Sequence, residues 1–146
     1  MSRRGYDHEP MAVLDHLSET LLQELAASFP GQRVLGAWLF GSHARGEPRP
    51  GSDVDLAVLA DGLLDPVALC DASGRLAAEI GAPVDLVDLR KAGGLLRVEA
   101  THHGRPLLPP THEANLFTTH ALADHAAFAP HRQAATRAFE EQLGVR

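Results

Sequence analysis

The sequence predicts an α/β fold in which a small mixed sheet is flanked by helices. Short, mostly apolar runs at 33–40, 53–59 and 83–89 alternate with longer segments of helical periodicity. Buried strands that alternate with amphipathic helices are typical of α/β domains. The chain has 146 residues, enough for one domain with a core of its own. We therefore expect a single domain over residues 1–146.

The first helix is expected from about residue 10 to residue 29. Apolar residues recur there at three- and four-residue spacings, which places them on one face of a helix. Pro30 and Gly31 then favour a helix end. The segment Arg33–Phe40 follows as a strand buried on both faces, because it is short, nearly all apolar and bounded by glycines.

The glycine- and proline-rich segment 41–52 is expected to be largely a loop. Asp53–Leu59 follows it as the second strand. The connection is too short for a helical crossover and longer than a tight hairpin turn. We expect the two strands that it joins to pair antiparallel.

The second half of the chain continues the alternation. Asp65 and Pro66 suit the N-cap and the first position of a helix that ends at Gly81. The remaining elements are a strand at 83–89, a helix at 94–103, a short extended piece at 105–108, and a helical segment at 111–143 that we expect Pro130 to break in two. Apolar residues of this last segment either pack on the domain or form a surface for a partner.

Charge and cysteine content limit the classes of ligand and the compartment. The 19 acidic residues outnumber the 13 basic ones, for a net charge of −6, so nucleic acid is not expected as a direct partner. A small anion held by a few local groups is still compatible. The single cysteine cannot form an internal disulfide, which indicates a reducing cytoplasm. No apolar run approaches the ~20 residues of a membrane span, so no membrane association is expected.

A phosphate-binding turn is predicted where the first strand ends. Gly41 allows the backbone to turn sharply and to approach a ligand closely. The amides that follow, together with the hydroxyl of Ser42, would form a cradle for phosphate. A Gly-Ser pair by itself is typical of an ordinary turn, so its meaning depends on the residues that follow.

Three aspartates provide the second half of the predicted site. Asp53 and Asp55 lie two residues apart in a strand, so their side chains point to the same face. Two adjacent carboxylates repel each other, and a divalent cation such as Mg²⁺ relieves the repulsion. Asp85 completes a triad if its strand lies next to theirs. Asp88 has the opposite parity, and we expect it to cap the following helix instead.

These parts suit one reaction when they occur together. Carboxylates can hold two metal ions that bridge a nucleoside triphosphate and an attacking hydroxyl. The turn at Gly41 and Ser42 would bind the phosphates that leave, and Asp85 could help to deprotonate the acceptor. Solvated acids at a strand end are the ordinary alternative for each aspartate taken separately. The combination predicts metal-dependent nucleotidyl transfer.

The sequence resembles the nucleotidyltransferase superfamily that includes DNA polymerase β. The motif of that superfamily is glycine-serine, roughly ten residues, and then Asp-x-Asp, which Gly41, Ser42, Asp53 and Asp55 match, with Asp85 as the third acid. The runs GSHARGE, SDVDLAVL, PVDLVDL and GRPLL are similar, more narrowly, to the minimal nucleotidyltransferase (MNT) antitoxins of HEPN/MNT toxin–antitoxin pairs. The likeness covers nearly the whole chain.

The resemblance implies an enzyme that uses ATP and Mg²⁺ to transfer AMP to a tyrosine of a HEPN ribonuclease toxin and so silences it. It also implies a catalytic core at about 31–108, C-terminal helices at about 111–143, and an oligomer possible in complex with the toxin. Two alternatives stay open: an antitoxin that acts by binding alone, and a small-molecule transferase of the aminoglycoside-modifying kind. Arg45 either contacts phosphate or pairs with an acid of the loop, and the role of His43 is open.

Overall fold

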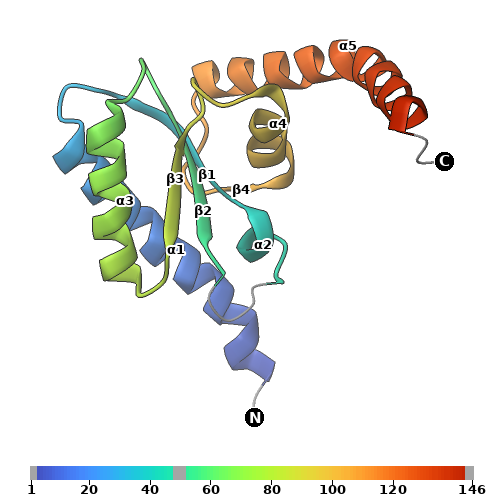
Figure 1. Ribbon diagram of the computed structural model, residues 1–146. Helices are drawn as coiled ribbons and strands as arrows, with labels where there is room; N and C mark the ends of the chain where they lie inside the picture. Colours follow the sequence, from blue (N-terminus) through green and yellow to red (C-terminus); the bar gives the residue numbers. More distant parts are fainter. Residues whose placement is uncertain (1–2, 48–51, 144–146) are drawn as a thin grey trace.

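The computed structural model describes the backbone of residues 3–47 and 52–143 and, outside 48–51, the side chains from 14 to 127. Nine elements follow one another (Figure 1): α1 Arg3–Ser28, β1 Val34–Phe40, α2 Gly41–Ala44, β2 Val54–Ala60, α3 Pro66–Ile80, β3 Val84–Asp88, α4 Gly94–His103, β4 Arg105–Pro106 and α5 His112–Leu143. Among these described residues, no helix is both long and apolar enough to cross a membrane.

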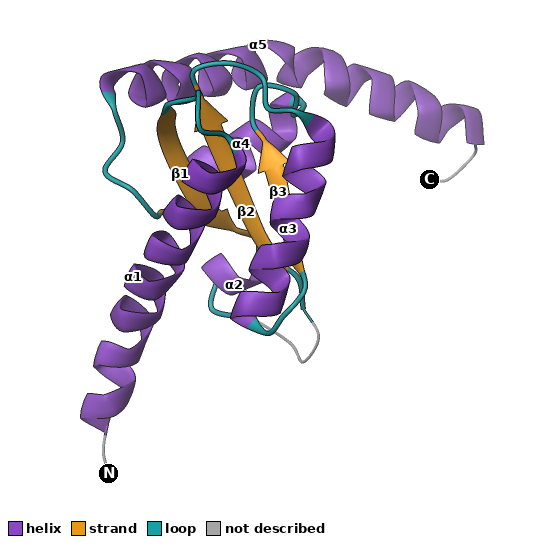
Figure 2. Cartoon of the chain, turned by 90° about the vertical axis from the view of Figure 1, so that its left-hand side faces the viewer, coloured by secondary structure: helices purple, strands orange, loops and turns teal. Residues whose placement is uncertain are grey.

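The four strands form one mixed sheet in the order β3-β2-β1-β4, and Figure 2 shows the first three of these side by side. β1 pairs antiparallel with β2 and with β4, whereas β2 and β3 run parallel. The predicted mixed sheet and the predicted antiparallel pairing of the first two strands are therefore confirmed. α3 supplies the crossover that a parallel pair requires.

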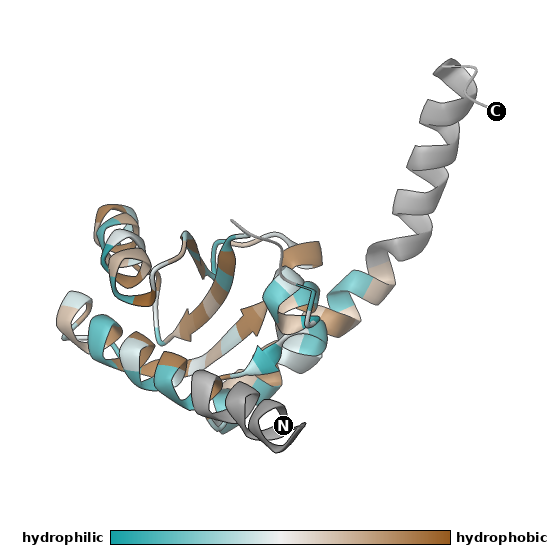
Figure 3. Ribbon diagram, turned by 90° about the horizontal axis from the view of Figure 1, so that it is seen from below, coloured by the Kyte–Doolittle hydropathy of each residue, from teal (hydrophilic) through white to brown (hydrophobic). Residues whose placement is uncertain are grey.

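Helices cover both faces of the sheet and create two hydrophobic clusters. On one face α1 and α3 pack on alternate residues of β2, including Leu56 and Val58. On the other face α4 and α5 pack on the intervening residues Ala57 and Leu59, together with Trp38 of β1. Figure 3 shows the hydrophobic colour of the strands between these two helical layers. β1 and β2 are therefore buried on both sides, as predicted for them, whereas β3 is only partly buried and the two residues of β4 are exposed.

The helix signals around α3 are confirmed in detail. The Asp65 carboxylate accepts a hydrogen bond from the Ala68 amide at 2.9 Å, and Pro66 is the first helical residue. Gly81 ends the helix with φ of 82°, a left-handed conformation that glycine adopts without steric cost.

Two prolines do not bound helices as the sequence suggested. α1 starts at Arg3 rather than near Pro10, and α5 runs unbroken through Pro130, so the expected C-terminal helices are one helix. Proline removes one backbone donor and crowds the carbonyl four residues earlier. Helices of 26 and 32 residues retain enough other hydrogen bonds to continue past that local loss.

Two further segments add detail to the expectation. The segment 41–52, expected to be largely a loop, begins with the short helix α2 and is turn or coil at 45–47 and 52; positions 48–51 lie outside the described residues. The extended piece expected at 105–108 is a strand of only two residues, Arg105 and Pro106. The Leu107 amide adds one more hydrogen bond, to the Ala37 carbonyl at 2.8 Å.

Asp88 does not cap the helix that follows it. Its carboxylate is 3% exposed and accepts hydrogen bonds from the amides of Leu64 (2.9 Å) and Arg90 (3.0 Å). The N-cap of α4 is Gly93, which makes no side-chain capping bond. The prediction was wrong because β3 pairs with β2 and places Asp88, its last residue, beside the loop that precedes α3.

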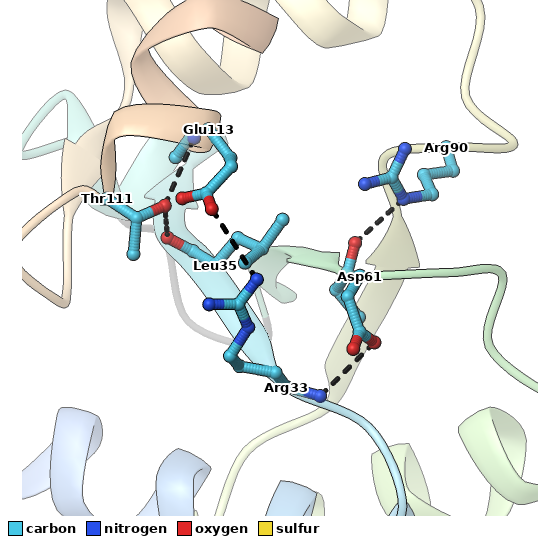
Figure 4. Close-up of polar contacts among 8 residues, drawn as sticks. Arg33, Leu35, Asp61, Arg90, Thr111 and Glu113 are labelled. Atoms are coloured by element: carbon cyan, nitrogen blue, oxygen red, sulfur yellow. Dashed lines mark hydrogen bonds and ion pairs between the residues drawn. The ribbon is translucent and has the colours of Figure 1, made fainter.

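Polar contacts also join the start of β1 to α5 (Figure 4). The Thr111 hydroxyl donates to the Leu35 carbonyl at 2.9 Å, and Arg33 Nη2 lies 3.5 Å from Glu113 Oε1. Nearby, Arg90 Nε donates to the Ala60 carbonyl at 2.7 Å. This end of the sheet is thus closed by side chains, and α2 lies at the opposite end of β1.

Replacement of Asp88 by alanine should destabilise the fold by about 2–3 kcal/mol, because hydrogen bonds to a buried carboxylate are lost and the Leu64 amide loses its acceptor. Asp61→Ala is the matched control, since Asp61 is exposed and accepts from the Arg33 amide at 3.2 Å. Urea unfolding should show a decrease in the free energy of unfolding that is several times larger for Asp88→Ala than for Asp61→Ala. Equal losses would contradict a structural role for the buried carboxylate.

Candidate active site

The predicted aspartates lie near one another at the starts of β2 and β3. Asp55 and Asp85 are direct partners in the parallel ladder, and Asp53 lies two residues before Asp55. By the alternation of strand side chains, these acids share the face on which Ala57 and Leu59 pack under α4 and α5. Asp88 pairs instead with Val58, further along the two strands. The structure thus brings Asp85 to Asp55.

Asp55 is at the centre of this group of acids. It is half-buried, while Asp53 and Asp85 are exposed. Burial, followed by the negative charges of Asp85 and Asp53, raises the pKa of the Asp55 carboxyl above its ordinary value, and the positive charges of His43 and Arg45 offset part of that rise. The site therefore favours either a proton or a cation beside Asp55.

Gly41 fits against Asp55 in a way that no other residue could. β1 ends at Phe40, which pairs with Asp55, so the turn into α2 passes directly over the carboxylate. Gly41 has φ of 74°, and a Cβ built on it would overlap Asp55 Oδ2. Both the backbone conformation and the space therefore require glycine. Ser42 comes next, half-buried, at the start of α2.

α2 is a single turn that contacts from other elements hold in place. The Glu47 amide donates to the Ser42 carbonyl at 2.9 Å, which closes the turn. Arg105 Nε, from β4, donates to the Ala44 carbonyl at 3.0 Å. His43 Nε2 lies 3.4 Å from the Ser52 carbonyl, so His43 links the two ends of the loop.

Arg45 faces acids on both sides. Its Nε lies 4.0 Å from Glu47 Oε2, and its Nη1 lies 3.6 Å from Glu99 Oε1 of α4. Of the two predicted roles for Arg45, the structure shows the pairing with an acid of the loop, Glu47. It also shows a second acidic partner, Glu99, which lies outside the loop. Sequence reasoning missed Glu99 and Arg105, because nothing in the local pattern points to partners 54 and 61 residues away.

A cavity of about 380 Å³ lies on the other face of the sheet. Its lining combines apolar side chains of α1, α3 and the sheet, such as Leu17 and Leu39, with polar ones that include His43 and Arg105. Val54, which also lines it, points to the face opposite Asp53 and Asp55. The cavity therefore lies across the sheet from the carboxylates and reaches His43 of α2.

The donor set fits a hard divalent cation. Three carboxylates at the starts of adjacent strands supply oxygen ligands, and burial, followed by the negative charges of Asp85 and Asp53, raises the pKa of Asp55. Among the side chains that the structure describes, at 14–47 and 52–127, no three of His, Cys, Asp or Glu are gathered closely enough to hold a metal ion as they stand. The residues therefore fit a cation by the type of their ligand atoms, while their side chains are not already arranged around a metal site.

Replacement of Asp55 by asparagine should stabilise the metal-free protein at neutral pH. The raised pKa means that ionised Asp55 costs folding free energy, and this cost is full above the folded-state pKa and absent below the ordinary value of about 3.9. Thermal unfolding in EDTA should show a higher Tm for Asp55→Asn at pH 7.5, with the gain shrinking as pH falls through that window. Asp71→Asn, on the exposed surface of α3, controls for the loss of one charge. An Asp55→Asn variant with no gain at pH 7.5 would contradict the crowding of the acids.

Replacement of Gly41 by alanine should cost more stability than replacement of Gly46. Both glycines have positive φ, 74° and 72°, and alanine at either position costs about 1–2 kcal/mol for the backbone conformation. Only at Gly41 does the new Cβ meet a side chain, that of Asp55. Chemical unfolding should therefore show a larger loss in the free energy of unfolding for Gly41→Ala than for Gly46→Ala. This difference should disappear in an Asp55→Ala background. Equal costs at the two glycines would show that the close approach is absent.

Comparison with known proteins identifies the family. The family model "Polymerase beta, Nucleotidyltransferase" matches residues 22–112. Protein adenylyltransferase MntA of Shewanella oneidensis is 34% identical over 97 residues, which are 66% of this chain and 70% of MntA. A chain in a crystal structure of a toxin–antitoxin with AMP-PNP aligns with a TM-score of 0.75 at 29% identity and covers 84% of this chain and 97% of its own.

A second solved structure agrees. The complex of tri-AMPylated Shewanella oneidensis HEPN toxin with MNT antitoxin aligns with a TM-score of 0.72 at 26% identity, covering 86% of this chain and 98% of that one. The region matched by the family model runs from within α1 to the start of α5 and includes the whole sheet and all three aspartates. The chain therefore belongs to the polymerase β-like nucleotidyltransferases, and within them to the minimal nucleotidyltransferases related to MntA.

Proposed function

We propose that this nucleotidyltransferase is the antitoxin of a toxin–antitoxin pair. It transfers AMP from ATP to a tyrosine hydroxyl of a cognate HEPN ribonuclease toxin, in a Mg²⁺-dependent reaction in the cytoplasm, and so neutralises the toxin. The observation that supports the chemistry most directly is the in-register pairing of Asp55 with Asp85, beside Asp53 and the turn at Gly41. The relatives named for adenylyltransferase activity and for complexes with HEPN toxin support the partner.

Each site residue has a role in this proposal. The backbone at Gly41 and the hydroxyl of Ser42 bind the phosphates that leave as pyrophosphate. Asp53 and Asp55 would hold Mg²⁺, and Asp85 would complete a site for two ions. The acceptor oxygen attacks the α-phosphorus, the bond from the α-phosphorus to the oxygen of the leaving pyrophosphate breaks, and the acceptor proton passes to Asp85. Bound Mg²⁺ would supply positive charge that stabilises the negative charge developing in the transition state.

The close packing of Gly41 on Asp55 has a consequence for this mechanism. A phosphate-binding turn that touches a metal-binding carboxylate holds both groups at a fixed separation. Such preorganisation avoids rearrangement during the reaction. The partial neutralisation of Asp55 by His43 and Arg45 favours an ionised carboxylate, which is the form that binds a cation.

The division of the chain follows from the same proposal. We assign the catalytic core to about residues 31–108, all of which lie within the region matched by the family model. The helix beyond it, expected at about 111–143, is observed as α5 His112–Leu143. The solved relative in complex with a tri-AMPylated HEPN toxin favours a folded protein over a small molecule as the acceptor.

The double variant Asp53→Ala with Asp55→Ala tests the chemistry. With the cognate toxin, ATP and Mg²⁺, AMP transfer should fall by more than about 100-fold, because the groups that compensate charge in the transition state are lost. Mass spectrometry should locate the added AMP on a toxin tyrosine for the unaltered protein. A pull-down should show that the variant still binds the toxin.

Two results would contradict the proposal. Inhibition of the toxin that ignores ATP, Mg²⁺ and the double substitution would indicate neutralisation by binding alone. AMP on a residue other than tyrosine would overturn the assigned acceptor while leaving nucleotidyl transfer intact. Asp71→Ala, which removes an exposed aspartate of α3, is the control for a change in charge.

A further inference from the structure

We propose that Glu99 of α4 is a positioning residue for nucleotide binding, because it holds the guanidinium of Arg45 beside the carboxylates. The inference rests on the proposed function, since it assigns a residue to the binding of the triphosphate. Glu99 lies outside the Gly-Ser and Asp-x-Asp motif, on a helix that follows all three aspartates in the chain.

The backbone of Arg45 is fixed before its side chain is considered. The Arg45 amide donates to the Gly41 carbonyl at 3.2 Å, which completes the turn of α2. The preceding carbonyl, that of Ala44, accepts from Arg105 Nε at 3.0 Å, and Ala44 itself is buried. Arg45 thus starts from a defined point, and only the direction of its long side chain is left to be set.

Two acids can set that direction, and they differ in rigidity. Glu47 follows α2 in the chain, its side chain is 76% exposed, and its contact with Arg45 is the longer one, at 4.0 Å. Glu99 is 38% exposed, lies 3.6 Å from Arg45, and belongs to α4. A side chain on an anchored helix holds its partner more precisely than one on an exposed turn. Glu99 is therefore the stronger candidate.

α4 is anchored firmly enough for this role. Val98 and Ala100, the neighbours of Glu99, are buried. Arg97 donates to the carbonyls of Leu89 and Arg90, both at 2.9 Å, and its guanidinium lies 5.1 Å from the centre of the Phe117 ring. These contacts tie α4 to the end of β3 and to α5, so Glu99 is presented from a fixed helix.

The local charges indicate why the direction of Arg45 matters. A triphosphate must approach a site that already holds three carboxylates, and Arg45 is one of two cationic groups whose charge acts on Asp55. A guanidinium presents five N–H donors in a planar fork, so a contact between Nη1 and Glu99 leaves capacity for phosphate oxygens. Glu99 holds that fork on the side of α4.

Two possible effects of Glu99, repulsion of the triphosphate and positioning of Arg45, predict opposite results for Glu99→Gln. If only charge mattered, the loss of a negative group near a triphosphate would tighten ATP binding. If Glu99 positions Arg45, its loss weakens binding even though repulsion falls. Glu47→Gln is the matched control, because it removes the same charge from the other partner of the same arginine.

Calorimetric titration of the whole chain with AMP-PNP and Mg²⁺ tests this without the toxin. We expect Glu99→Gln to weaken AMP-PNP binding about three- to fivefold, the range that a partly exposed ion pair supports. AMP binding should be unchanged, and Glu47→Gln should leave AMP-PNP binding unchanged or slightly tighter. In an Arg45→Met background, Glu99→Gln should have no further effect. In transfer assays, Glu99→Gln should raise the KM for ATP and change kcat by less than about twofold.

Several outcomes would overturn the inference: tighter AMP-PNP binding by Glu99→Gln, equal effects of Glu99→Gln and Glu47→Gln, or a Glu99→Gln effect that persists without Arg45. An unaltered protein that does not bind AMP-PNP would overturn both the inference and the proposed function. An unaltered protein that binds AMP-PNP but transfers no AMP would contradict the proposed function only. In that case the binding results for Glu99→Gln still decide the inference.

Discussion

The crowding of negative charge around Asp55 is the constraint on which the rest of the site depends. Burial raises the pKa of Asp55, and the negative charges of Asp85 on the neighbouring strand and of Asp53, just before β2, raise it further. A folded protein gains nothing in stability from such an arrangement. It is useful only when something positive occupies the space between the acids, and this connects the electrostatics of the site to a reaction that uses a cation and a polyphosphate.

The sheet makes this crowding possible. β2 and β3 run parallel and in register, so two carboxylates near the starts of different strands become direct neighbours. β1 runs antiparallel to β2, so the C-terminal end of β1 places Gly41 beside the Asp55 carboxylate. The hydrophobic clusters on both faces fix the strands, and with them the separation between the phosphate-binding turn and the acids. Burial of the strands is thus what allows the exposed groups to be held close together.

Sequence reasoning succeeded where the signal is local or periodic. The apolar runs predicted the three long strands, alternation placed Asp53 and Asp55 on one face, and Asp65, Pro66 and Gly81 marked the ends of α3. It failed at Pro10 and Pro130, because the other hydrogen bonds of two long helices outweighed the local cost of proline. It also failed for Asp88, whose carboxylate accepts from the Leu64 amide of a loop that the sequence could not place. The contacts of Arg45 with Glu99 and of Arg105 with Ala44 lie beyond any local pattern, since they form only when α4 and β4 return to the sheet.

The most direct test of the account is the pKa of the Asp55 carboxyl itself, measured by carboxyl-carbon NMR on the metal-free protein. The account predicts a value above the ordinary one of about 3.9, lowered by Asp85→Asn because one repelling charge is removed, and lowered again in the unaltered protein when Mg²⁺ and AMP-PNP are added. An Asp55 carboxyl that titrates at its ordinary value, and that responds neither to Asp85→Asn nor to Mg²⁺ with AMP-PNP, would contradict it.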